Sequence, residues 1–187
     1  MKYIIYILLS FNLMTFAISA EETRQVDKHE HGVGELNIAV EGSTIEFEFM
    51  IPGADIVGFE YVAKSDEDIA KINQALKTFD DYTNIFTLPS NSLCELNGQQ
   101  VALKEEDDHD EHDDHDEHDD HDEHAEENHN EFYAKYSFEC GDTKAINKVE
   151  FPYFSTFPNS GELEVQFISS KGSVSFEVEA EEPSINI

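Results

Sequence analysis

One segment limits what this chain can fold into. From residue 105 to residue 131 the sequence is a run of acidic residues and histidines without Lys or Arg, and its first apolar residue is Ala125. Like charges repel along such a run, and without apolar side chains to bury, folding cannot offset the loss of conformational entropy. We therefore expect a disordered, flexible His/Asp-rich insertion and a folded domain built from the sequence on both sides of it.

Histidines recur at every third position of the insertion, with Asp or Glu between them. They are His109, His112, His115, His118, His121 and His124. Zinc is bound in proteins by imidazole nitrogen and carboxylate oxygen, usually with four ligands to an ion. In an extended chain with three residues per turn all six imidazoles point the same way, so two or three can close on one ion with little rearrangement. The spacing predicts several overlapping zinc sites.

The choice of metal is less constrained than the presence of metal sites. Nickel and copper(II) also bind imidazole, so the spacing alone leaves both open. A thioether site for copper(I) is disfavoured because Met50 is the only methionine after residue 20. Calcium would not need the histidines, and a charged spacer would not need their regular spacing. Since metal binds deprotonated imidazole, we expect binding to weaken below about pH 6.

The overall charge narrows the class of partner. The chain has 42 acidic and 11 basic residues, with a formal net charge of −31. Such a field repels nucleic acid and anionic membrane surfaces and attracts cations. The HExxH and GxSxG patterns that mark metalloprotease and hydrolase sites are missing from the sequence. We therefore expect a metal-binding protein that is not an enzyme and has no nucleic-acid partner.

The first twenty residues differ from the rest of the chain. Met1–Lys2 is basic, Tyr3–Ile18 is uncharged and mostly apolar, and Ser19–Ala20 supplies small residues before two acidic ones. This order is typical of a secretory signal peptide, and the apolar run is too short for a comfortable membrane span. We expect cleavage after residue 20. The exported product would be a single domain, residues 21–187, without direct membrane insertion.

The two cysteines, Cys94 and Cys140, lie on opposite sides of the insertion. An even number of cysteines in an exported chain favours a disulfide. That bridge would close a loop containing the whole insertion and tie both of its ends to the fold. The alternative is a pair of thiolate zinc ligands, which an oxidising compartment disfavours.

Alternating apolar residues predict strands on both sides of the insertion, because period-two alternation buries one face of a strand. The alternating sets are Leu36, Ile38 and Val40; Ile45, Phe47, Phe49 and Ile51; Phe132, Ala134, Tyr136, Phe138 and Cys140; Leu163, Val165 and Phe167; and Val174, Phe176 and Val178. Gly42–Ser43 and Lys171–Gly172 predict hairpin turns. Asn97–Gly98, between apolar stretches at 93–96 and 99–103, is the strongest hairpin signal.

One amphipathic helix is predicted after Ser65, a suitable N-cap followed by three acidic residues. Ile69, Ile72, Leu76 and Phe79 then recur at helical spacing, which predicts a stripe packed on the core. Together these elements predict a mainly β fold. We expect an antiparallel β-sandwich or partly open barrel of about eight strands with one packed α-helix.

Several stretches resemble the ZrgA family of periplasmic zinc-uptake proteins. They are HEHGVGELNIAVEG from His29, IPGADIVGFE at 51–60, LCELNG around Cys94, the His/Asp run, HNEFYAKYSFEC at 129–140, and the closing strand pair. The resemblance implies zinc binding in the periplasm in support of import through a partner membrane transporter. The family's HxHG histidines correspond to His29 and His31, and its HxEF pair corresponds to His129 and Glu131. Tyr61 stands where the resemblance leads us to expect a histidine after GFE.

The resemblance also leads to a two-part hypothesis for metal binding. A tighter site would form on the β scaffold from His29, His31, His129 and Glu131, and the repeat would act as a collector that feeds it. The alternative function is a periplasmic buffer or detoxification protein for zinc, nickel or copper that delivers no metal.

Overall fold

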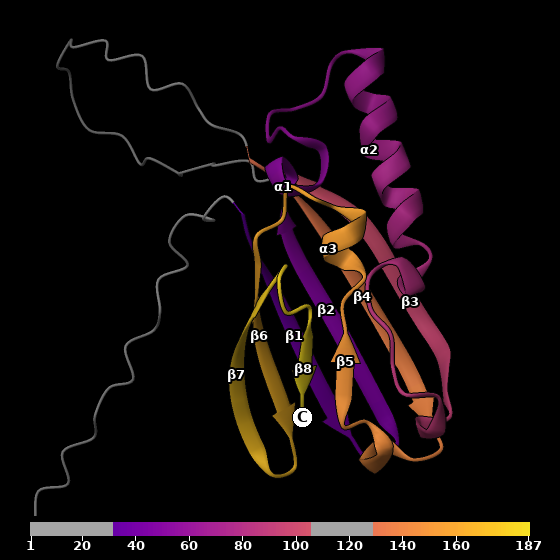
Figure 1. Ribbon diagram of the computed structural model, residues 1–187. Coiled ribbons are helices and arrows are strands. Elements are labelled where there is room, and N and C mark those ends of the chain that lie inside the picture. Colours follow the sequence, from indigo (N-terminus) through magenta and orange to yellow (C-terminus); the bar gives the residue numbers. More distant parts are fainter. Residues whose placement is uncertain (1–31, 106–128) are drawn as a thin grey trace, which may run out of the picture.

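The fold is built on a six-stranded mixed sheet and a smaller two-stranded sheet (Figure 1). The computed structural model describes residues 32–105 and 129–187. The strands are β1 (Val33–Glu41), β2 (Thr44–Pro52), β3 (Cys94–Glu105), β4 (Asn130–Cys140), β5 (Lys148–Glu150), β6 (Glu162–Ser169), β7 (Gly172–Glu179) and β8 (Ser184–Asn186). The helices are α1 (Gly53–Val57), α2 (Asp66–Phe79) and α3 (Tyr153–Thr156), with 3-10 turns η1 (Tyr82–Asn84), η2 (Ser90–Ser92) and η3 (Thr143–Ala145).

The strand order of the large sheet is β3-β4-β2-β1-β6-β7, and β5 pairs with β8. The predicted mainly β class is confirmed, but the predicted antiparallel sandwich or partly open barrel is wrong in detail. Strands β1 and β6 are parallel, and the edge strands β3 and β7 are not joined, so the sheet stays open within the described ranges. Strands β4 and β6 run in the same direction, so the chain between them must return along the sheet. It does so as η3, β5 and α3 (Figure 1).

The core lies between one face of the large sheet and this returning segment. The alternating residues of β1, β2 and β4 point into it, as predicted, and Phe47, Phe49 and Tyr136 are fully buried. Phe86 stacks on Phe47 with ring centroids 4.1 Å apart, so the loop before β3 also contributes to the core. The prediction is weaker at the edge strand β7, where Val174 is 54% exposed, since β7 has a neighbour on one side only. The sheet is therefore apolar on the covered face and largely polar on the other.

The predicted hairpin at Asn97–Gly98 is wrong, because both residues lie inside strand β3. The chain does not turn there: β3 continues from Cys94 to Glu105, with a register irregularity between Leu96 and Gly98. The reason is that β4 pairs with β3 along its whole length, so the local turn preference is absorbed in a bulge. The partner of β3 is thus the strand on the other side of the His/Asp-rich insertion.

The predicted helix is confirmed as α2. Its N-cap Ser65 accepts a hydrogen bond from the backbone N–H of Asp68 at 3.1 Å. Three residues of the predicted core stripe pack on the core, since Phe79 is fully buried and Ile72 and Leu76 are partly buried against it, while Ile69 is 43% exposed. Figure 1 shows the N-terminal end of α2 extending beyond the end of the sheet. No helix in the described ranges is both long and apolar enough to cross a membrane.

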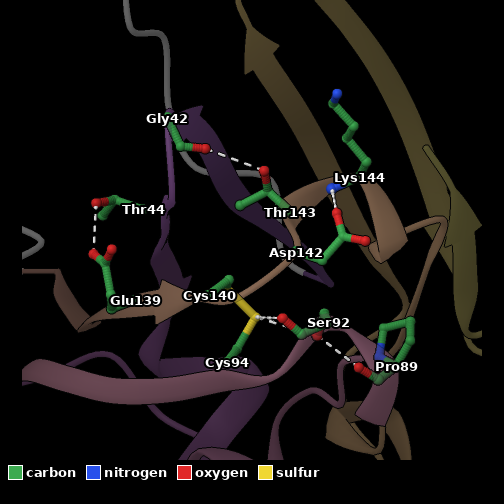
Figure 2. Close-up of a disulfide and its surroundings, with 10 residues drawn as sticks. All are labelled: Gly42, Thr44, Pro89, Ser92, Cys94, Glu139, Cys140, Asp142, Thr143 and Lys144. Atoms are coloured by element: carbon green, nitrogen blue, oxygen red, sulfur yellow. Dashed lines mark hydrogen bonds between the residues drawn. A yellow bond between two sulfur atoms is a disulfide. The ribbon is translucent and has the colours of Figure 1, made fainter.

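The two cysteines form a disulfide, which confirms the predicted bridge over the zinc-thiolate alternative (Figure 2). Cys94 and Cys140 are directly opposite each other on β3 and β4. Hydrogen bonds hold the chain on both sides of the disulfide. On the β3 side, Ser92 is buried and donates its hydroxyl to the carbonyl of Pro89 at 2.6 Å. On the β4 side, Thr143 donates its hydroxyl to the carbonyl of Gly42 at 3.1 Å. The disulfide therefore closes one end of the β3–β4 pair.

Candidate metal centre

One end of the large sheet gathers the segments that the sequence links to metal binding. Strands β1 and β4 both pair antiparallel with β2 and flank it, so both begin where β2 ends. Neighbouring strands are about 4.8 Å apart, which places the starts of β1 and β4 about 10 Å from each other. Strand β3 ends at the same place, since Glu105 is the register partner of Asn130. The disulfide lies at the opposite end of β3 and β4, so Cys94 and Cys140 take no part in this site.

The connecting segment 53–61, which includes α1, holds the starts of both strands. Gly32, just before β1, donates its backbone N–H to Oδ1 of Asp55 at 2.8 Å. Asn130, the first residue of β4, donates its backbone N–H to the carbonyl of Glu60 at 2.9 Å. Figure 1 shows α1 above the end of the sheet, between these two strand starts. The two strand starts are therefore fixed to one short segment of chain.

His129 is the only histidine among the described residues, and its ring lies against a carboxylate. Its Nδ1 is 2.8 Å from Oε2 of Glu60, and the side chains of His129 and Glu60 are 37% and 12% exposed. Glu131, the second residue of β4, is buried, with 6% of its surface exposed. The start of β4 thus offers the imidazole of His129 and the carboxylate of Glu131, and the segment after α1 brings Glu60 to the imidazole.

Asn130 anchors the start of β4 to the segment at 59–61. Its side chain is 2% exposed and donates Nδ2–H to the carbonyl of Tyr61 at 3.1 Å. Its Oδ1 has no hydrogen-bond donor within the described ranges and lies beside Gly53. A Cβ at position 53 would collide with this oxygen and come within 2.7 Å of the carbonyl of Phe59. Glycine at 53 is therefore required for Asn130 to reach the 59–61 segment.

Asp55 is a further buried acidic residue at this end of the sheet. Asp55 is 3% exposed, and it lies near the fully buried Tyr153. Burial raises the pKa of Tyr153, and the negative charge of Asp55 raises it further. Tyr153 therefore stays neutral at physiological pH, and its hydroxyl accepts a hydrogen bond from Ser160 at 2.7 Å. Asp55, Glu60 and Glu131 make this end of the sheet rich in carboxyl groups, which attract cations, and Lys104 is the cross-strand partner of Glu131.

The predicted site residues divide into two groups. The structure describes His129 and Glu131 and places both at the start of β4. The remaining predicted ligands lie outside the described residues: His29, His31, His109, His112, His115, His118, His121 and His124. Asn130 and Glu131, which we expected in the flexible insertion, are buried residues of β4. Within 32–105 and 129–187, no three His, Cys, Asp or Glu side chains are grouped so as to hold a metal ion.

Glu60 and Asn130 were not predicted as site residues. Glu60 ends the stretch IPGADIVGFE, so its position in the motif was visible, but its contact with His129 spans 69 residues of chain. Asn130 stands between the two residues that were selected as ligands, and nothing in its type distinguishes it from a surface amide.

Comparison with protein families shows which family the chain belongs to. A family model described as "ZrgA family zinc uptake protein" matches residues 28–187. The chain belongs to the ZrgA family. The matched range includes His29 and His31, the whole insertion, and both cysteines. No curated protein matches the chain at a significant level. Membership in the ZrgA family assigns the protein to zinc uptake, which is a transport-associated role rather than a catalytic one.

Proposed function

We propose that this protein is a periplasmic zinc-binding protein that captures zinc through its His/Asp/Glu-rich segment and supports zinc uptake by a partner membrane transporter. One observation carries the proposal. The insertion leaves the sheet at the end of β3 and returns at the start of β4, at the end of the sheet where β1 begins. The repeat and the HxHG and HxEF motifs are therefore attached to the same end of one rigid scaffold.

The register of β3 and β4 supports a collecting role for the repeat. Glu105 and Asn130 are cross-strand partners, so the two ends of the insertion are held about 5 Å apart. Both ends of the insertion are thus attached close to His129. A zinc ion released from the repeat would therefore be at a high effective concentration near His129.

The donor types at the strand starts fit zinc. His129 supplies imidazole and Glu131 supplies carboxylate, while Gly32, which follows His31 in the sequence, is anchored to Asp55. Imidazole and carboxylate together are a common zinc ligand set. We propose that His29, His31, His129 and Glu131 form the tighter site, with zinc as cargo rather than as a permanent cofactor.

The proposed location follows from covalent chemistry. The Cys94–Cys140 disulfide is consistent with an oxidising, extracytoplasmic compartment. The signal-like residues 1–20 lie outside the described residues and support export only as a sequence prediction.

Deletion of residues 107–126 tests the two-part picture. The variant should bind fewer zinc ions but retain one tight site, because the ends of β3 and β4 that frame that site remain. Zinc stoichiometry by native mass spectrometry and affinity by competition with a chelator are the measurements.

A matched variant with the six repeat histidines changed to Gln controls for charge. It keeps the length and the acidic residues of the insertion, and it should lose the same zinc ions as the deletion if imidazole is the ligand. Loss of all zinc from the deletion variant would refute the separate tight site. Absence of zinc binding by the unaltered chain at neutral pH would refute the function itself.

A further inference from the structure

The contact between Glu60 and His129 is the best-defined side-chain pair at the proposed metal centre. Oε2 of Glu60 is 2.8 Å from Nδ1 of His129, which is hydrogen-bonding distance. A neutral imidazole carries its proton on one nitrogen and a lone pair on the other, and the hydrogen bond made by one nitrogen decides which is which. A carboxylate accepts and cannot donate, so it favours the proton on Nδ1.

We propose that Glu60 is a positioning residue that holds the proton of His129 on Nδ1, so that zinc binds at Nε2. This inference rests on the proposed function, in which His129 is a zinc ligand. Carboxylate partners of metal-bound histidines fix the orientation of the ring and raise its basicity. Glu60 would therefore strengthen the zinc site without touching the ion.

A positioning residue needs a fixed backbone, and hydrogen bonds fix the backbone around Glu60. Asn130 binds it twice, through its backbone N–H to the carbonyl of Glu60 and through Nδ2–H to the carbonyl of Tyr61. The ring of Tyr61 stacks on Phe59 with centroids 4.6 Å apart, and its hydroxyl donates to Asp68 of α2 at 3.2 Å. The carboxylate of Glu60 is thus placed by a segment anchored to β4 and to α2.

The same pair of atoms would also suit a second arrangement, in which Glu60 and Nδ1 of His129 both bind the ion. The partial burial of Glu60 and the hydrogen-bonding distance favour the positioning role. The two arrangements differ in which ring nitrogen the metal occupies, and this difference can be measured.

The tautomer of His129 in the metal-free protein is the first test. Long-range proton–nitrogen spectra of the purified chain labelled with ¹⁵N report which ring nitrogen carries the proton, and His129→Gln assigns the signals. The unaltered chain should show the proton on Nδ1. Glu60→Ala should move the population toward the proton on Nε2, and Glu60→Gln should largely restore the original tautomer, because the amide oxygen accepts the same hydrogen bond. An unchanged tautomer in Glu60→Ala would overturn the proposal.

Metal binding is the second test. With ¹¹³Cd as the probe, scalar coupling should appear at Nε2 of His129, and coupling at Nδ1 would overturn the proposal in favour of direct ligation by Glu60. Competition with a chelator at substoichiometric zinc should show a loss of roughly 10- to 100-fold in affinity of the tight site for Glu60→Ala. Glu177→Ala, which removes an equal charge from an exposed position on β7, should leave that affinity unchanged.

The two tests separate the failure of this inference from the failure of the proposed function. The tautomer is read without metal, so it responds to Glu60 even if the chain bound no zinc. Conversely, tight zinc binding that is insensitive to Glu60→Ala would leave the function standing and would remove the positioning role.

Discussion

Tyr136 shows how much a single hydroxyl contributes at the residue scale. Its ring is fully buried in the core, and its hydroxyl donates to the carbonyl of Phe79 at 2.6 Å. Phe79 is the last residue of α2, where carbonyl groups have no partner within the helix. Burial raises the pKa of Tyr136, and the nearby charges of Asp80 and Asp81 raise it further. The hydroxyl thus connects the centre of the sheet to the end of the helix.

Tyr136→Phe should lower the free energy of unfolding by about 1–2 kcal/mol, because the carbonyl of Phe79 loses its partner in a buried place. Urea unfolding followed by circular dichroism measures this change. Tyr82→Phe is the control, since its ring centroid lies only 6.4 Å from that of Tyr136 and its hydroxyl makes no hydrogen bond within residues 32–105 and 129–187. A similar loss in both variants would contradict the assignment.

The same residue predicts a dependence on alkaline pH. Its pKa is raised in the folded state, so its contribution is fully present below about pH 10, the value in the unfolded chain, and is lost as the pH rises above it. Stability should therefore fall less steeply above pH 10 in Tyr136→Phe than in the unaltered chain.

Only part of the candidate site could be predicted residue by residue. His129 and Glu131 were selected because their motif resembles that of a family, and their residue types suit zinc. Glu60 was missed because its contact joins the segment after α1 to the start of β4, 69 residues away, and no local pattern reveals it. Asn130 was missed for the same reason, since its importance comes from the space left by Gly53.

At the scale of elements, local signals were reliable where nothing competed with them. The alternation in β1, β2 and β4 and the N-cap of α2 were confirmed, because each reflects burial or capping within a short stretch. Asn97–Gly98 failed as a turn because the pairing of β3 with β4 outweighed a local preference. Ile69 was expected to be packed because periodicity shows which face of a helix is apolar but not how far the sheet beneath it extends.

The repeat carries a prediction of its own. Zinc binding by the intact chain should be weaker and of lower stoichiometry at about pH 5.5 than at about pH 7.5, because protons compete for imidazoles whose reference pKa is about 6.5. Isothermal titration at the two pH values measures the effect. The variant with six Gln in place of the repeat histidines should show a much smaller loss of stoichiometry. Equal stoichiometry and affinity at both pH values would show that imidazole is not the main ligand.

At the scale of the whole molecule, the strand order could not be predicted. The parallel pairing of β1 with β6 depends on the path of the chain between β4 and β6, and composition does not specify that path. The disulfide was predictable, since it required only two cysteines and an exported chain. What the structure adds is its place, at the far end of β3 and β4 from the proposed metal centre.

Removing the disulfide should affect stability and zinc binding differently. The Cys94→Ala/Cys140→Ala variant should lose roughly 4 kcal/mol of stability, since the bridge closes a long loop with a sequence separation of 46. Its zinc stoichiometry under native conditions should be unchanged, because the β3–β4 pairing holds the other end of the insertion. Thermal unfolding and native mass spectrometry are the measurements. Loss of the tight zinc ion from the still-folded variant would show that the bridge shapes the metal centre.

The pairing of Glu105 with Asn130 has an evolutionary consequence. Because β3 and β4 are paired up to the point where the insertion begins, the length of the insertion has little effect on their pairing. For the disordered loop that the composition predicts, doubling its length costs only about 0.6 kcal/mol in closure entropy. Under the proposed function, the number of zinc ions that the chain captures can therefore change through gain or loss of repeats, while the β scaffold stays the same.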